Sequence, residues 1–73
     1  MSTDQAFAPF ANDTQVMTLT DGIHELSFEN GTESVLLAGE IELTADQEGL
    51  QHVRALREAL AAVEAAILGR LQR

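Results

Sequence analysis

The side chains that could do chemistry in this chain of 73 residues are two histidines, 12 acidic residues and three serines. The sequence contains no cysteine, lysine, tyrosine or tryptophan. Ser2, Ser27 and Ser34 have no histidine and carboxylate near them in an arrangement that would activate a hydroxyl as a nucleophile. We therefore expect that the protein is not an enzyme.

The two histidines are the candidate metal ligands. Glu48 and His52 stand four residues apart on a predicted helix, where their side chains share one face. Two ligands do not make a zinc site, so we interpret them as an ordinary surface pair. His24 falls on the apolar face of a predicted sheet beside Leu19 and Leu37, which indicates a partly buried histidine with a backbone partner rather than a ligand or a catalytic base. We expect no metal and no cofactor.

Charge is distributed unevenly along the chain. All four basic residues are arginines after position 53, whereas ten of the 12 acidic residues lie before that position. The first 53 residues therefore carry a formal charge of −10, and the last 20, with four arginines and two glutamates, carry +2. A surface of this sign repels phosphate backbones, so we expect no nucleic-acid binding. A basic protein partner, or the helix of a second copy, is favoured.

Several glutamates gather on the outer face of the predicted sheet or beside a turn: Glu25, Glu40, Glu42, Glu29 and Glu33. Such a row could imitate the phosphates of a nucleic acid toward a basic protein. It is also typical of a solvated face without a partner. The first alternative predicts an acidic inhibitor or antitoxin-like protein.

Two dipeptides predict the turns of a β-meander. Asp21-Gly22 and Asn30-Gly31 accept positive φ at both central positions of a type I′ turn, which joins strands through a two-residue loop. With these turns, Met17 lies opposite Leu26, and Leu26 lies opposite Val35. Both registers place the same apolar side chains on one face: Met17, Leu19, Leu26, Phe28, Val35, Leu37, Ile41 and Leu43. We therefore predict three antiparallel strands within residues 15–43.

A long helix is predicted from about residue 45 to 70. Thr44-Ala-Asp-Gln47 fits the capping-box pattern at its start, and Gly49 is a weak point that costs about 1 kcal/mol relative to alanine. Apolar residues then recur every three or four positions and form one stripe, which we expect to cover the sheet: Leu50, Val53, Leu56, Leu60, Val63, Ile67 and Leu71. The predicted fold is α+β, a three-stranded antiparallel meander followed by one long C-terminal helix (β-β-β-α), completed by dimerisation. It occupies residues 15–73 as a single domain after a flexible N-terminal arm, residues 1–14, that Phe7 and Phe10 could dock.

Two surplus surfaces suggest a homodimer interface. In the predicted register Ile23 pairs with Ala38, so five residues overhang without a strand beside them: Gly39, Glu40, Ile41, Glu42 and Leu43. An unpaired edge is a template for another strand, either from the N-terminal arm or from a second copy across a two-fold axis. A second helical stripe of small residues would let another helix approach closely: Ala55, Ala59, Ala62, Ala66 and Gly69. The competing explanation is that alanine is simply the best helix former.

The length of the chain favours self-association as well. A chain of this size buries only about 60% of the surface that its unfolded form exposes, and oligomerisation is one way to thicken a thin core. The N-terminus lacks the basic flank and apolar run of a signal peptide, and no apolar run reaches the roughly 20 residues of a membrane span. We expect a soluble, cytoplasmic, bacterial protein that acts as a self-associating interaction module, with the acidic inhibitor as the alternative.

Overall fold

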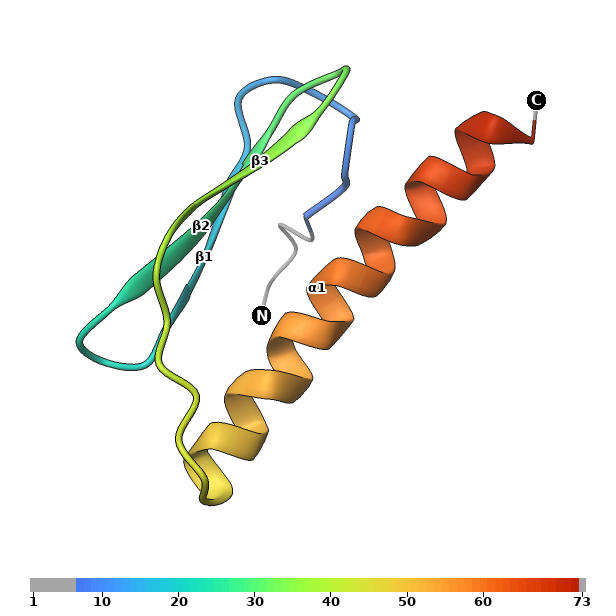
Figure 1. The fold of residues 1–73 in the computed structure, drawn as a ribbon. Helices are drawn as coiled ribbons and strands as arrows, with labels where there is room; N and C mark the ends of the chain where they lie inside the picture. The colour runs from blue at the N-terminus through green and yellow to red at the C-terminus, as the bar shows by residue number, and fades with distance from the viewer. Residues whose placement is uncertain (1–6, 73) are drawn as a thin grey trace, which may run out of the picture.

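A computed structural model of the protein describes residues 7–72 as three antiparallel strands followed by one long helix (Figure 1). Strand β1 is Val16–Thr20, β2 is Glu25–Asn30 and β3 is Val35–Gly39; helix α1 is Gln47–Leu71. The strands are neighbours in chain order, β1-β2-β3, and both pairings are antiparallel. The predicted β-β-β-α fold is confirmed.

Both hairpin loops are longer than predicted. Thr20 lies opposite Glu25, and Asn30 lies opposite Val35, so each loop contains four residues instead of two. A type I′ turn needs positive φ at both central residues. Of the four turn residues, Gly22 alone has a positive φ, 98°. The predicted type I′ turns are therefore wrong, and the pairing is displaced by two residues in the first hairpin and by four in the second.

The apolar face of the sheet survives these displacements because both are even. Side chains alternate between the two faces of a strand, so only an odd displacement would turn them over. Met17 now lies opposite Phe28, and Phe28 lies opposite Leu37. Phe28, at the centre of this face, is 0% exposed and is the one fully buried hydrophobic side chain in residues 7–72.

Strand β3 ends earlier than predicted, at Gly39. This residue lies opposite Leu26 and has a φ of 110°, and a side chain on it would collide with the backbone of Glu25. The Glu40 N–H donates to the Glu25 carbonyl oxygen at 2.9 Å. The predicted overhang is therefore wrong for its first residue, which has a strand partner, and residues 40–43 form a connection toward the helix instead of a strand.

Helix α1 begins two residues later than the predicted capping box. Its N-cap is Asp46, whose side chain accepts a hydrogen bond of 2.9 Å from the Gly49 N–H. Thr44 acts on the cap indirectly, because its hydroxyl donates to Asp46 Oδ1 at 2.6 Å. These two hydrogen bonds lower the pKa of Asp46, the bond from Thr44 more strongly. Gly49 is buried against the backbone of Thr44, so the connection folds back tightly over the first turn.

The segment before β1 lies between the sheet and the C-terminal half of the helix (Figure 1). The edge of the Phe7 ring contacts the Phe28 ring, with 6.4 Å between the ring centroids. Asn30, only 7% exposed, holds the backbone of the segment: its Oδ1 accepts from the Phe10 N–H and its Nδ2 donates to the Ala8 carbonyl, both at 2.8 Å. A polar side chain at the end of β2 therefore joins the segment to the sheet.

The helix also holds this segment, through Arg70. The Arg70 guanidinium lies 5.0 Å from the centre of the Phe10 ring and donates to the Phe10 carbonyl at 3.3 Å. Phe10 has a φ of 70°, a conformation that a bulky residue adopts only when its surroundings impose it. The flexibility of the arm, residues 1–14, stays a prediction, and residues 1–6 lie outside the described residues.

The helix covers the sheet with a different side from the one predicted. Its half-buried apolar residues are Leu56, Ala59, Val63 and Ala66, a mixture of the two predicted stripes. β1 is the strand closest to it. The remaining large apolar side chains of the helix are exposed, so the prediction that the whole stripe covers the sheet is wrong.

Candidate functional site

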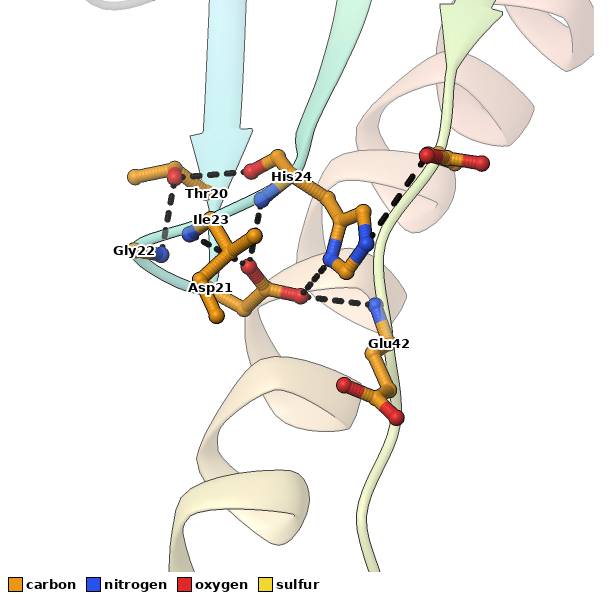
Figure 2. Close-up of polar contacts among 7 residues, drawn as sticks. Thr20, Asp21, Gly22, Ile23, His24 and Glu42 are labelled. Atoms are coloured by element: carbon orange, nitrogen blue, oxygen red, sulfur yellow. Dashed lines mark hydrogen bonds and ion pairs between the residues drawn. The ribbon is translucent and has the colours of Figure 1, made fainter.

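The first candidate site is the loop between β1 and β2, built around the carboxylate of Asp21 (Figure 2). Asp21 Oδ1 accepts from the N–H groups of Ile23 at 2.9 Å and His24 at 2.7 Å, which closes the loop from within. Thr20 adds to this closure, since its hydroxyl donates to the His24 carbonyl at 2.8 Å and accepts from the Gly22 N–H at 3.0 Å. The loop is thus fixed by side chains and not by the backbone of a type I′ turn.

The second oxygen of Asp21 reaches the connection between β3 and α1. Oδ2 accepts from His24 Nδ1 at 3.0 Å and from the Glu42 N–H at 2.9 Å, and Figure 2 shows both bonds converging on this atom. The Asp21 side chain is only 9% exposed. The N–H of His24, then those of Glu42 and Ile23, hold the pKa of this carboxyl far below its usual range. Asp21 is therefore ionised and fastens two segments 21 residues apart.

His24 completes this cluster. Its side chain is 30% exposed, and its Nε2 lies 3.8 Å from a carboxylate oxygen of Glu40. The hydrogen bond to Asp21 raises the pKa of His24, with smaller contributions from the negative charges of Asp21, Glu40 and Glu42. His24 is half-buried, as predicted, but its predicted place on the apolar face with a backbone partner is wrong, because the residue belongs to the loop and its ring lies between carboxylates.

The chemistry of Asp21, His24 and Glu42 favours a structural role, holding the loop and the connection together, over a metal centre. Ligand atoms of Asp21, His24 and Glu42 lie within 4.8 Å of one another, beside a shallow cavity of about 210 Å³ lined by His24, Glu40, Ile41 and Glu42. However, both oxygens of Asp21 already accept two hydrogen bonds each. A raised pKa also favours protonated His24, and a metal ligand must be unprotonated.

Glu48 and His52, interpreted from the sequence as an ordinary surface pair, do not both lie on the surface. His52 is half-buried, and its Nδ1 is buried without a hydrogen-bond partner within residues 7–72. Glu48 is exposed in the first turn of the helix. The interpretation of both as surface residues is therefore wrong for His52.

The residues predicted for the interface lie at two opposite edges of the sheet. Ala55, Ala59 and Ala62 line a groove of about 310 Å³ between the helix and β1, together with Phe7, Met17, Leu19 and Glu58. Glu40, Ile41, Glu42 and Leu43 follow Gly39 at the end of β3, on the other edge. Ala66 is half-buried on the side of the helix that covers the sheet. The structure does not bring these two groups together, and their place in an interface stays a prediction.

A third surface was missed by the sequence-based reasoning. Six large side chains of α1 are 39–75% exposed and lie beside the half-buried side that covers the sheet; we call them the outer stripe: Leu50, Val53, Leu60, Ile67, Leu68 and Leu71. The signal was present, because the apolar arc of the helix is wider than one thin sheet needs. The prediction placed the surplus on the alanines, whereas the structure places it on the leucines.

Comparison with known proteins found no matching family model, no matching curated protein and no matching solved structure. Within the described part of the chain, no helix has the length and apolar character needed to cross a membrane.

Proposed function

We propose that the protein is a small self-associating interaction module that works as a homodimer. The observation that carries this proposal is a contrast within residues 7–72, between a single fully buried hydrophobic side chain, Phe28, and the six exposed side chains of the outer stripe. A contiguous apolar surface of this kind marks an interaction site in a soluble protein. A second copy would supply the apolar contacts that the thin core lacks.

The free energy gained by burying the outer stripe is comparable with the cost of forming a dimer. If its six side chains lose their remaining exposure, each contributes on the order of 1 kcal/mol, or roughly 10 kcal/mol for two copies. Association costs about 4–15 kcal/mol in lost rotational and translational freedom. The two quantities are comparable, and contacts outside the stripe add to the first. We therefore expect a dissociation constant in a range that a concentration series resolves.

Light scattering across a concentration series tests this proposal. The monomer mass is 7.9 kDa, and the expected result is twice this mass at high micromolar concentration, falling as the sample is diluted. Circular dichroism on the same samples reports whether the chain is folded. A folded monomer at high micromolar concentration would overturn the proposal.

A second candidate function is supported by the outer face of the sheet, opposite the helix. Glu29 lies between Val16 and Leu36 in the strand register, and these two apolar side chains are 57% and 59% exposed. Acidic groups beside exposed apolar ones would suit a basic protein surface, as an inhibitor requires. The alternative function is therefore that of an acidic inhibitor that binds a basic surface of a partner protein.

A pull-down from the native host at low and high salt separates the two functions. A basic protein captured at low salt and released at high salt supports the inhibitor, provided that Glu25→Gln/Glu29→Gln loses it. Glu58→Gln, on the helix, is the matched control and should capture as well as the wild type. If the protein is a homodimer and captures no salt-sensitive partner, the inhibitor is contradicted and the self-associating module is supported.

A further inference from the structure

We propose that the dimer forms by antiparallel packing of the two α1 helices through their outer stripes, across a two-fold axis close to Leu60. This inference rests on the proposed self-association and adds the surface, the orientation and the register. The occupant of the outer stripe is the same stripe of a second copy.

The spacing of the outer stripe is that of a helix–helix seam. At 100° per residue, Leu60, Val53, Ile67 and Leu71 fall within about 40° of one another, and Leu50 and Leu68 widen the arc to about 100°. Val53, Leu60 and Ile67 are seven residues apart, which is the repeat of a coiled-coil seam. The side chains that cover the sheet, such as Leu56 and Val63, lie to one side of this arc. The stripe is therefore free for a partner.

Two charges inside the stripe select the antiparallel orientation. Arg57 and Glu64 are both exposed, and they stand three residues before and four residues after Leu60. In an antiparallel pair centred near Leu60, Arg57 of each copy faces Glu64 of the other, which forms two opposite-charge contacts. In a parallel pair, each of these residues would face its own counterpart. Like charges at such positions are unfavourable and reject the parallel alternative.

The apolar side chains match in the same register. When Arg57 faces Glu64, Leu50 faces Leu71, and Val53 faces Leu68. Leu60 lies beside its own counterpart at the centre. In this register, five of the six large side chains of the stripe therefore meet an apolar side chain of the partner helix.

The charge of the whole chain also favours helix pairing over strand pairing. The helix contains three of the four arginines within its bounds, whereas most acidic residues lie before it. Pairing through the edge beyond β3 would bring the exposed Glu40 and Glu42 of both copies together. Pairing through the outer stripes does not require these glutamates to approach one another.

Disulfide trapping tests the orientation directly, because the chain has no cysteine of its own. Leu60→Cys should form a covalent dimer under mild oxidation. Val53→Cys alone should not, because its counterpart lies 15 residues along the partner helix, about 22 Å away. An equimolar mixture of Val53→Cys and Leu68→Cys should form the mixed disulfide. In a parallel dimer, Val53→Cys alone would cross-link, and the mixture would form no disulfide between positions 53 and 68.

A charge swap tests the register without oxidation. Arg57→Glu and Glu64→Arg should each raise the dissociation constant at least tenfold at low salt, and the double variant should restore most of the loss. Both positions are exposed, so circular dichroism should show an unchanged helix content. Arg54→Glu, at an exposed position outside the arc, is the control and should change the dissociation constant much less.

The failure of this inference differs from the failure of the proposed function. A wild-type dimer in light scattering, with cross-linking of Val53→Cys alone or with no covalent dimer from Leu60→Cys, would overturn the antiparallel helix pair and leave self-association standing. A wild type that is a folded monomer would overturn both.

Discussion

The same substitution should have opposite effects at the two glycines of helix α1. Gly49 is buried in the first turn, and a methyl group there would collide with the backbone of Thr44. Gly69 is exposed in the last turn, and a methyl group there would meet nothing within 4 Å. Gly49→Ala should therefore destabilise the protein, and Gly69→Ala should stabilise it.

The magnitude at Gly49 follows from three contributions. Alanine gains up to about 1 kcal/mol of helix propensity. The collision involves backbone atoms, which cannot rotate away as a side chain does, and such overpacking costs about 1–3 kcal/mol. Moving the connection also weakens the hydrogen bond from the Gly49 N–H to Asp46, and a lost helix cap costs about 1 kcal/mol. The expected net loss is about 1–3 kcal/mol.

Gly69→Ala keeps only the first contribution, so we expect a gain of about 0.5–1 kcal/mol. Thermal and urea unfolding, followed by circular dichroism, measure both values. For a chain of this size, 1 kcal/mol shifts Tm by about 4–8 °C. All proteins are compared at one concentration, since dimerisation would make Tm depend on it. Gly69 lies on the side of the helix opposite Leu60, so its substitution leaves the outer stripe unchanged.

An equal gain in stability from both alanines would refute this reasoning. It would mean that the connection does not fold back tightly over the first turn. A loss at Gly69 would show instead that its surface is occupied by another copy. The wild type, the two single variants and the double variant form a double-mutant cycle. The effects of the two substitutions should add, because the two glycines are far apart.

Two further predictions concern polar side chains whose hydrogen bonds hold the loops and the N-terminal segment in place. Asn30→Ala should cost about 2 kcal/mol in urea unfolding, because it removes the acceptor of the part-buried Phe10 N–H and one of the two donors to the Ala8 carbonyl; a loss below about 0.5 kcal/mol would contradict this role. His24→Gln should cost more stability at pH 6 than at pH 9. The raised pKa of His24 means that its contribution is complete below its unfolded pKa and is lost as pH rises through the folded value. An equal cost at both pH values would contradict a charged contact with Asp21.

The elements of the fold were predictable because their periods are clear. Alternating residues from Met17 to Leu37 predicted the strands, and steps of three and four residues after Leu50 predicted the helix. The loops were not predictable in the same way. Asp21-Gly22 and Asn30-Gly31 permit a type I′ turn without requiring one. In the fold, the side chains of Asp21 and Asn30 bond to the chain elsewhere, and the longer loops let them do so.

The candidate interaction surface was only partly predictable, for a different reason. Composition and arc width showed that the helix has more apolar surface than the sheet needs. Which part faces the sheet depends on the rotation of the helix about its axis, and tertiary contacts fix this rotation. The docked segment around Phe7 and Phe10, which Arg70 contacts, is one such contact. No local pattern around Leu60 indicates its exposure.

The connection between β3 and α1 bears on how two copies can associate. Two copies of a small protein often dimerise by exchanging a terminal helix, and the exchange requires the connecting segment to open and extend. Here that segment is fastened near both ends: Asp21 holds the Glu42 N–H, and Gly49 lets the Thr44 backbone pack against the helix. Opening it would break the hydrogen bond between Asp21 and the Glu42 N–H and would separate the Thr44 backbone from Gly49. The fastened connection between β3 and α1 therefore disfavours a domain-swapped dimer, and each copy keeps its own helix when it associates with another.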